Sequence, residues 1–193
     1  MSRMLTLTAS RADDGAGREL DTLEQLYRRY RGPVQHYLFQ LCGSLDQAEE
    51  LTQETFIRAH TGLLTFRGDC SVATWLFAIA RNLYLKSLRH PSPARIDTAE
   101  LLEIPDATAG GDPVRQYAAS EQRDLIALAL GQLPEKQRSI LLLRDAEGLA
   151  YDEIARVLEI SLSAVKVNLF RARAAFRAAY AEIDASGREG SFV

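Results

Sequence analysis

The sequence has few of the residues that build metal centres and disulfide frameworks. Its 193 residues include only two cysteines and three histidines. Cys42 and Cys70 form no CxxC pair. The histidines, at His36, His60 and His90, have neither the mutual spacing nor the cysteine neighbours of a zinc site. The sequence therefore predicts no bound metal, and unpaired thiols are typical of a reducing compartment.

Long apolar runs and catalytic motifs are also absent. No run approaches the roughly 20 apolar residues that a membrane-spanning helix needs, and the N-terminal segment lacks the continuous apolar core of a secretory signal. The sequence has no phosphate-cradling glycine loop and no nucleophile motif. We therefore expect a cytoplasmic protein without direct membrane insertion, catalytic residues or cofactors.

The charges are segregated along the chain, although the net charge is only −3. Residues 81–95 contain basic side chains and no acid, and the same is true of residues 160–180. Acidic residues gather instead at 46–54 and 97–112. Separate basic patches are typical of proteins that bind phosphates, whereas one such patch alone is better explained as a solvated helix face. The pattern favours a nucleic-acid partner despite the acidic total.

Apolar residues recur at three- and four-residue spacing over most of the chain, and no alternating strand pattern of any length occurs. We therefore predict an all-α fold of two helical domains, at residues 21–90 and 120–184. A flexible acidic linker at residues 91–119, rich in proline and glycine, should join them. A disordered tail at residues 1–20 and a short tail at 185–193 complete the expected organisation.

Individual helices are expected between capping and breaking residues. Gly32-Pro33 should break or kink the first helix, because proline removes an amide donor, and Asp46 should cap the second. The expected helices are 23–41 with that interruption, 46–64, 71–88, 121–133, one that starts at Pro134 and ends near Gly148, 151–158, and one from Ser161 to about 183.

Residues 151–169 have the pattern of a helix-turn-helix. Ile154 and Leu158 face inward, and the small Ala155 allows the two helices to cross closely. Such a motif places its second helix in the DNA major groove, although purely structural helix pairs share the spacing. Two positions look unfavourable: Ala150 replaces a capping serine, and Glu159 occupies a turn where glycine would relieve strain.

Four ordered segments of this chain resemble the extracytoplasmic-function (ECF) sigma factors of the sigma-70 family. They are AEELTQETFIRA, FRGDCSVATWLFAIARN, LPEKQRSILLLRDAEGL and YDEIARVLEISLSAVKVNLFRAR, and the resemblance covers residues 23–180. It implies an RNA polymerase sigma factor that directs core polymerase to specific promoters, helps to melt them, and is held inactive by an anti-sigma factor. Residues 21–90 then correspond to sigma region 2, and residues 120–184 to region 4.

The resemblance also implies roles for residues of the first domain. The acidic helix would bind core RNA polymerase through Asp46, Glu49, Glu50, Leu51, Gln53, Glu54 and Phe56. The following loop would capture a base flipped from the melted non-template strand of the minus-ten element, and the next helix would follow its phosphates. The residues concerned are Phe66, Arg67, Gly68, Asp69, Cys70, Ser71, Arg81, Asn82, Lys86 and Arg89. Cys70 stands where a small serine-like residue is common.

In the second domain, the resemblance implies contacts with the duplex minus-thirty-five element. The residues concerned are Arg144, Tyr151, Ser163, Lys166, Val167, Asn168, Phe170, Arg171 and Arg173. The family more usually has serine and arginine at the positions of Val167 and Asn168, so this chain is expected to read different bases. Lysine and arginine suit phosphates or guanine, asparagine suits adenine, and an apolar side chain suits a thymine methyl group.

Three other classes of protein compete with this interpretation. A stand-alone helix-turn-helix regulator would bind duplex DNA tightly by itself, and it would have no use for the acidic helix. A helical adaptor without a DNA role would not need the acid-free stretch around Arg171 and Arg173. An enzyme would need a catalytic motif that the sequence does not contain.

Overall fold

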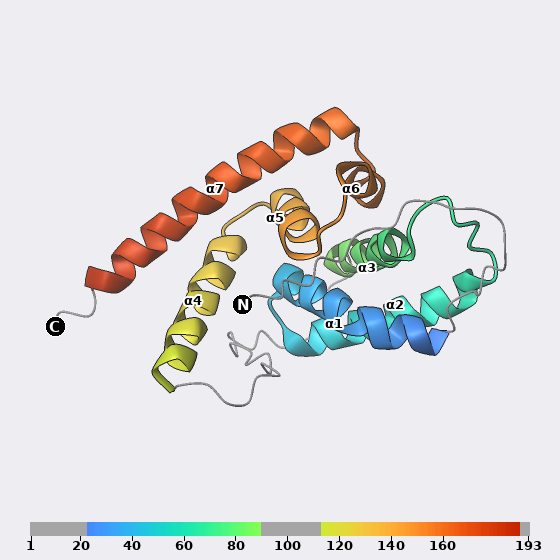
Figure 1. Cartoon of the computed structure of the whole chain (residues 1–193), viewed down its shortest axis with the longest axis horizontal. Coiled ribbons are helices and arrows are strands. Elements are labelled where there is room, and N and C mark those ends of the chain that lie inside the picture. The colour runs from blue at the N-terminus through green and yellow to red at the C-terminus, as the bar shows by residue number, and fades with distance from the viewer. Residues whose placement is uncertain (1–22, 90–112, 190–193) are drawn as a thin grey trace, which may run out of the picture.

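The computed structural model describes residues 23–89 and 113–189, and every regular element in these two ranges is helical (Figure 1). In chain order the elements are α1 (Leu23–Cys42), α2 (Leu45–Leu63), α3 (Val72–Arg89), α4 (Pro113–Gly131), α5 (Glu135–Leu141), the π-helical turn η1 (Leu142–Ala146), α6 (Tyr151–Leu158) and α7 (Leu162–Glu189). The all-α prediction is confirmed for this part of the chain. The predicted N-terminal tail, most of the predicted linker and the last residues lie outside it.

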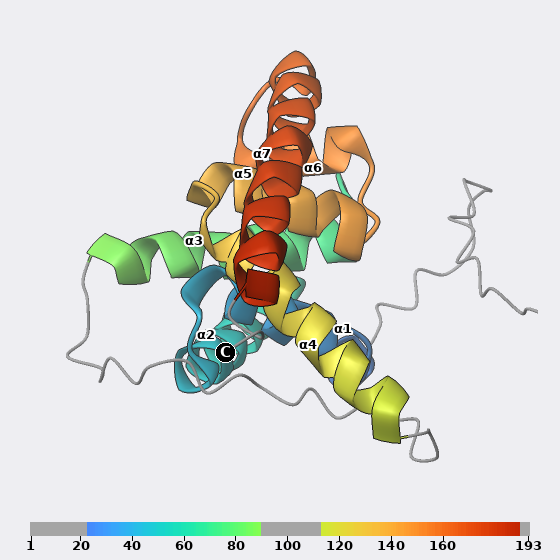
Figure 2. The same cartoon turned by 90° about the vertical axis from the view of Figure 1, so that its left-hand side faces the viewer.

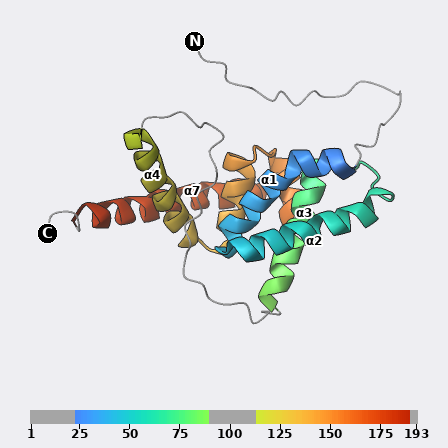
Figure 3. The same ribbon diagram turned by 90° about the horizontal axis from the view of Figure 1, so that it is seen from below.

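Helices α1, α2 and α3 cross one another and enclose the first half of the core (Figure 3). Gly32-Pro33 was expected to break or kink this helix, and the break is wrong, because α1 runs from Leu23 to Cys42 with Pro33 inside it. Val34, Tyr37 and Leu38 are fully buried in the turns that follow. A proline inside a helix costs about 3 kcal/mol, and each buried apolar side chain returns about 1.5–3 kcal/mol. Tertiary packing therefore outweighs the missing hydrogen bond.

The cap of α2 is Ser44, so the prediction of Asp46 as the cap is also wrong. Ser44 has an extended backbone, and its side chain accepts a hydrogen bond from the Gln47 amide. The helix therefore begins at Leu45. Asp46 lies in its first turn, where a carboxylate interacts favourably with the helix dipole.

The second half is built around α7, which packs along α4 and α5 (Figure 2). Helix α4 begins at Pro113, inside the segment predicted as linker and earlier than the expected start at residue 121. Pro134 stands directly before α5, where its missing amide costs nothing. After η1, Gly148 adopts a positive φ of 72°, which ends the helical stretch as predicted.

The helix-turn-helix is confirmed as α6 followed by α7. Glu159 has a φ of 54°, so the left-handed residue in the turn is indeed not a glycine. Ser161 caps α7 by accepting a hydrogen bond from the Ala164 amide. Ala150 has no side chain that can cap α6, but the Glu153 carboxylate accepts a hydrogen bond from the Ala150 amide at 2.9 Å. Half of a capping box is therefore present.

The two halves are in direct contact. Helix α6 lies against α3, and α4 and α5 lie against α1 (Figure 1). The start of the helix-turn-helix thus lies beside the loop between α2 and α3.

Candidate nucleic-acid interface

A small pocket opens at the junction of α2, the loop 64–71 and α3. Its volume is about 300 Å³, and its lining consists of Gly62, Thr65, Phe66, Arg67, Asp69, Cys70 and Trp75. Phe66 and Trp75 form one aromatic wall, with ring centroids 4.8 Å apart and ring planes inclined by 32°. The structure therefore brings four residues of the predicted base-capturing loop into one cavity with an aromatic surface.

Trp75 was not among the predicted site residues, because a lone tryptophan on an amphipathic helix is more often a core residue. Gly62 explains how it reaches the pocket. A Cβ atom at this position would lie only 2.8 Å from Cζ2 of the indole. The absence of a side chain on α2 therefore allows the indole to lie directly on the helix. A glycine on the helix face toward an aromatic residue was the signal that sequence reasoning missed.

The loop backbone is set by Gly68 and Ser71, the two residues of the predicted loop 66–71 that do not line the pocket. Gly68 adopts a φ of 71°, which favours glycine. The Ser71 hydroxyl accepts a hydrogen bond from the Thr74 amide at 3.1 Å and so caps α3. Burial raises the pKa of the Cys70 thiol, although the nearby Arg156 opposes this shift. A raised pKa leaves less of the reactive thiolate at neutral pH.

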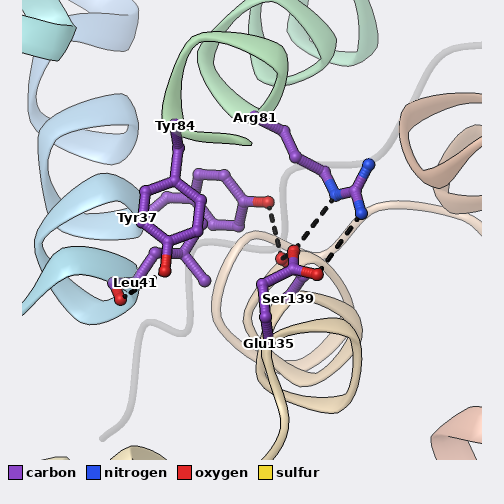
Figure 4. Close-up of polar contacts among 6 residues, drawn as sticks. All are labelled: Tyr37, Leu41, Arg81, Tyr84, Glu135 and Ser139. Carbon is purple, nitrogen blue, oxygen red and sulfur yellow. Dashed lines mark hydrogen bonds and ion pairs between the residues drawn. The ribbon is translucent and has the colours of Figure 1, made fainter. Parts of the chain in front are cut away.

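The predicted polar contacts of α3 divide into two groups. Asn82, Lys86 and Arg89 are exposed. Arg81 is only 8% exposed, and its Nε lies 3.3 Å from Glu135 Oε1 on α5 (Figure 4). In this arrangement Arg81 faces the second half of the molecule and not solvent, so the structure does not place it with the other basic residues.

The predicted polymerase-binding residues lie on α2, but only some are accessible. Asp46, Glu49, Glu50 and Gln53 are exposed, and Glu54 pairs with Arg58 at 2.7 Å. Leu51 and Phe56 are buried, so they support the helix from within.

An apolar groove of about 650 Å³ lies beside these residues, between α1 and α2. Ile57 and Tyr27 line it and are 61% and 39% exposed. Ile57 is a further contact candidate that the acidic pattern alone did not indicate.

The exposed face of α7 joins apolar and basic side chains. Phe170 is 72% exposed and Val167 is 49% exposed, and Lys166 and Arg171 are exposed on the same face. A phenylalanine this open to water favours a binding surface, because large apolar side chains are normally buried.

The other predicted residues of the second half are engaged within the domain. Asn168 donates a hydrogen bond to the Ala164 carbonyl at 2.8 Å. Arg173 forms a bidentate pair with Asp145 at 2.6 and 3.1 Å, and these hydrogen bonds raise its pKa. Arg144 packs over the Tyr151 ring, and the Ser163 hydroxyl lies 3.0 Å from that of Ser161.

The described part of the chain contains no group of histidine, cysteine or acidic side chains that could hold a metal ion. Within the same part, no helix has both the length and the apolarity to cross a membrane.

Each half of the molecule matches a known protein-family model. Residues 26–92 match the model of "Sigma-70 region 2", and residues 123–176 match that of "Sigma-70, region 4". The chain is 33% identical over 153 residues to the RNA polymerase sigma factor YlaC of Bacillus subtilis, covering 79% of this chain and 88% of that protein. It belongs to the sigma-70 family of RNA polymerase sigma factors.

Two further sigma factors are similar to this chain in sequence. The sigma factor is 32% identical over 157 residues to the RNA polymerase sigma-H factor of Pseudomonas aeruginosa, covering 78% of this chain and 81% of that one. It is 32% identical over 136 residues to the ECF RNA polymerase sigma-E factor of Escherichia coli K12, covering 65% of this chain and 70% of that one. The resemblance to the ECF group is thereby confirmed.

Solved structures agree on the fold of this sigma factor. A sigma factor RpoE in complex with the anti-sigma factor NepR, from Bartonella quintana, superposes with a TM-score of 0.64 at 21% identity and covers 81% of this chain and 94% of that one. CnrH in complex with the cytosolic domain of CnrY gives a TM-score of 0.61 at 24% identity, covering 84% of this chain and 88% of that one. Region 2 corresponds to α1, α2 and α3, and region 4 lies within α4 to α7.

Proposed function

We propose that this sigma factor melts promoters by holding one unstacked base of the non-template strand in the pocket between α2 and α3. The observation that carries the proposal is the aromatic wall of Phe66 and Trp75 beside the polar loop residues Arg67 and Asp69. Flipping a base out of the duplex costs a few kcal/mol. Stacking on an aromatic side chain returns about 1–3 kcal/mol per base, and loop hydrogen bonds to the base edge add selectivity.

The strand beyond the flipped base would follow α3. Asn82, Lys86 and Arg89 are exposed along one side of this helix, and lysine and arginine neutralise phosphates independently of sequence. In this proposal they position the strand, whereas the pocket selects the base.

Helix α7 would read the duplex minus-thirty-five element. Lys166 and Arg171 provide cations for phosphates or guanine, and Val167 and Phe170 provide apolar surface for thymine methyl groups. Asn168 and Arg173 would have to leave their present partners, Ala164 and Asp145, to reach DNA. We therefore assign base contacts to Val167 and Phe170, which can reach DNA without leaving a partner within the domain.

The exposed acidic residues of α2 would bind a basic surface of core RNA polymerase. The apolar groove beside them extends this surface, because Ile57 and Gln53 lie next to each other on α2 and both line the groove. A surface that joins acidic and apolar side chains is better explained by binding of a specific protein partner than by a need for solubility alone.

An inhibitory protein partner is part of the proposal. Two of the solved structures that resemble the fold are complexes, one of the sigma factor RpoE with the anti-sigma factor NepR and one of CnrH with the cytosolic domain of CnrY. We infer that an anti-sigma factor holds this chain inactive in the cytoplasm until a signal releases it. Mixing with such a protein is expected to abolish transcription.

Run-off transcription tests the function directly. Purified core polymerase, this protein and a library of random promoter DNA should yield transcripts whose templates share two spaced upstream elements. The same selection repeated with the Val167→Ala protein should change the bases selected at the upstream element and leave those of the downstream element unchanged. Absence of any factor-dependent transcript, together with tight binding of duplex DNA without polymerase, would identify a stand-alone regulator instead.

A further inference from the structure

Arg173 on α7 is paired with Asp145, an acidic residue of the π-helical turn η1. Its Nε and Nη2 atoms donate hydrogen bonds to the two carboxylate oxygens, at 3.1 and 2.6 Å. Both oxygens are therefore occupied, in the bidentate geometry that suits a planar guanidinium. The two residues are 28 positions apart in the sequence. The pair thus joins two separate elements, whereas the pair of Arg58 with Glu54 lies within one helix.

The π-helical turn η1 fixes the position of Asp145. The Glu147 amide donates a hydrogen bond to the Leu142 carbonyl, five residues earlier, at 2.9 Å, which is the wide turn of a π-helix. Leu142 and Leu143 are buried and anchor this turn in the core. Asp145 is therefore held in place by its neighbours, and π-helical turns occur frequently at functional sites.

Arg173 lies beside the residues of α7 that the proposed function assigns to DNA. It follows Lys166 by seven positions and Phe170 by three, so the three residues lie on successive turns of the same side of the helix. Seven residues span about 10.5 Å of helix, and the major groove is about 12 Å wide, with phosphates along both edges. A long basic side chain at this position can therefore reach a phosphate when no carboxylate holds it.

Pairing with Asp145 removes Arg173 from the cations that are available to DNA. A phosphate would have to displace both hydrogen bonds, and the carboxylate left beside it would repel it. Both side chains are 45% exposed, and ion pairs that are this accessible to water contribute little to folding stability. The pair is therefore better explained by an effect on binding than by an effect on the fold.

We propose that Asp145 is a positioning residue of the helix-turn-helix, which holds Arg173 away from DNA phosphates and so limits binding that is independent of sequence. A phosphate contact strengthens binding to every sequence alike. Without this contact, α7 is retained less strongly on DNA of unrelated sequence. This inference rests on the proposed function, because it assumes that α7 is the surface that meets duplex DNA.

The salt dependence of binding identifies a phosphate contact that is gained or lost. Each phosphate that a protein neutralises changes the slope of log K against log salt concentration by about 0.9. One extra contact therefore strengthens binding by up to about eightfold at 0.1 M salt, relative to 1 M salt. A change in folding stability alone would not produce this slope.

The test measures how the full chain, assembled with core polymerase, binds a labelled duplex with the selected upstream element and a duplex of scrambled sequence. Asp145→Asn keeps the size of the side chain and removes its charge. This variant is expected to bind both duplexes about three- to eightfold more tightly at 0.1 M salt, with a slope that is steeper by about 0.9. Glu182→Gln is the matched control, because it removes one negative charge from an exposed residue of the same helix. It should leave affinity and slope unchanged.

A second substitution shows whether the gain depends on Arg173. In the Asp145→Asn chain, Arg173→Ala should remove the gain and return the slope to that of the unmodified chain. In the unmodified chain the same substitution should cost much less affinity. The two changes should therefore be coupled in a double-mutant cycle by a factor of about three or more. Thermal unfolding checks that all variants are equally folded.

Different results would contradict the role of Asp145 and the proposed function. Equal losses from Arg173→Ala in the two chains, or an unchanged slope for Asp145→Asn, would overturn the role of Asp145. If Lys166→Ala weakens binding in the same experiment, the proposed DNA surface of α7 is supported whatever Asp145 does. If Lys166→Ala and Phe170→Ala both bind as the unmodified chain does, the proposed function of α7 is itself contradicted.

Discussion

Gly62 leaves the space that the Trp75 indole occupies, because a Cβ atom on Gly62 would lie only 2.8 Å from Cζ2 of the indole. Gly62→Ala must therefore displace the indole and disturb the wall that it forms with Phe66. We expect a loss of about 1–3 kcal/mol of folding stability, as for other overpacked sites, and at least tenfold weaker promoter-dependent transcription. Thermal unfolding and run-off assays measure the two effects.

The matched control for this substitution is Gly32→Ala in α1, where a new Cβ would meet nothing within 4 Å. This variant should gain about 0.5–1 kcal/mol, because alanine favours a helix interior over glycine, and should transcribe normally. Equal behaviour of the two variants would contradict the role assigned to the Gly62–Trp75 contact.

The aromatic wall predicts a specific defect for Phe66→Ala. Loss of about 1–3 kcal/mol of stacking per base should reduce open-complex formation on duplex promoters about tenfold or more. On a template with a pre-melted bubble, Phe66→Ala should regain most of its activity, because the bases there are already unpaired. Leu64→Ala is the control, because Leu64 is 89% exposed and does not line the pocket. A defect of equal size on both templates would indicate a folding role for Phe66.

The exposed Phe170 predicts a contact with thymine methyl groups. Replacing thymine by uracil in the upstream element should weaken binding about fourfold, the equivalent of about 0.8 kcal/mol for one buried carbon. Phe170→Ala should show the same loss on thymine DNA and no further loss on uracil DNA. Leu128→Ala, an exposed apolar residue on α4, should leave both affinities unchanged. Additive losses from uracil and Phe170→Ala would place the methyl contact elsewhere.

Burial raises the pKa values of both thiols, so alkylation should be slow. Since a raised pKa leaves less thiolate at a given pH, iodoacetamide at pH 8 should modify Cys70 and Cys42 more slowly than free cysteine. The rate should rise as the pH passes the ordinary thiol value toward the raised one. Mass spectrometry of the alkylated sites provides the measurement. Transcription by the unmodified chain and by Cys70→Ser should respond equally to peroxide, and a response that the serine variant lacks would indicate that Cys70 senses oxidants.

Much of the fold was predictable because local signals agreed with tertiary packing. The short helix 151–158, the cap at Ser161 and the left-handed turn at Glu159 follow from periodicity and capping rules and appear in the structure as expected. Pro33 shows the limit of such rules. Local chemistry predicts a break there, whereas burial of the following turns keeps α1 continuous.

The candidate site was less predictable because it depends on contacts between distant residues. The sequence identified the loop 66–71, whereas the space that Gly62 leaves for Trp75 depends on how α2 and α3 pack against each other. The basic pattern grouped Arg81 with Lys86, although a difference of five positions places the two on different sides of α3, with Arg81 turned toward Glu135. Arg81 and Glu135 are 54 positions apart in the sequence, so local periodicity cannot indicate that they pair.

The left-handed residue Glu159 has a consequence for the geometry of the helix-turn-helix. Its φ of 54° makes the tight turn between α6 and α7, so this one backbone position sets the direction in which α7 leaves α6. In the proposed function, the same position therefore sets the angle at which α7 meets a DNA duplex.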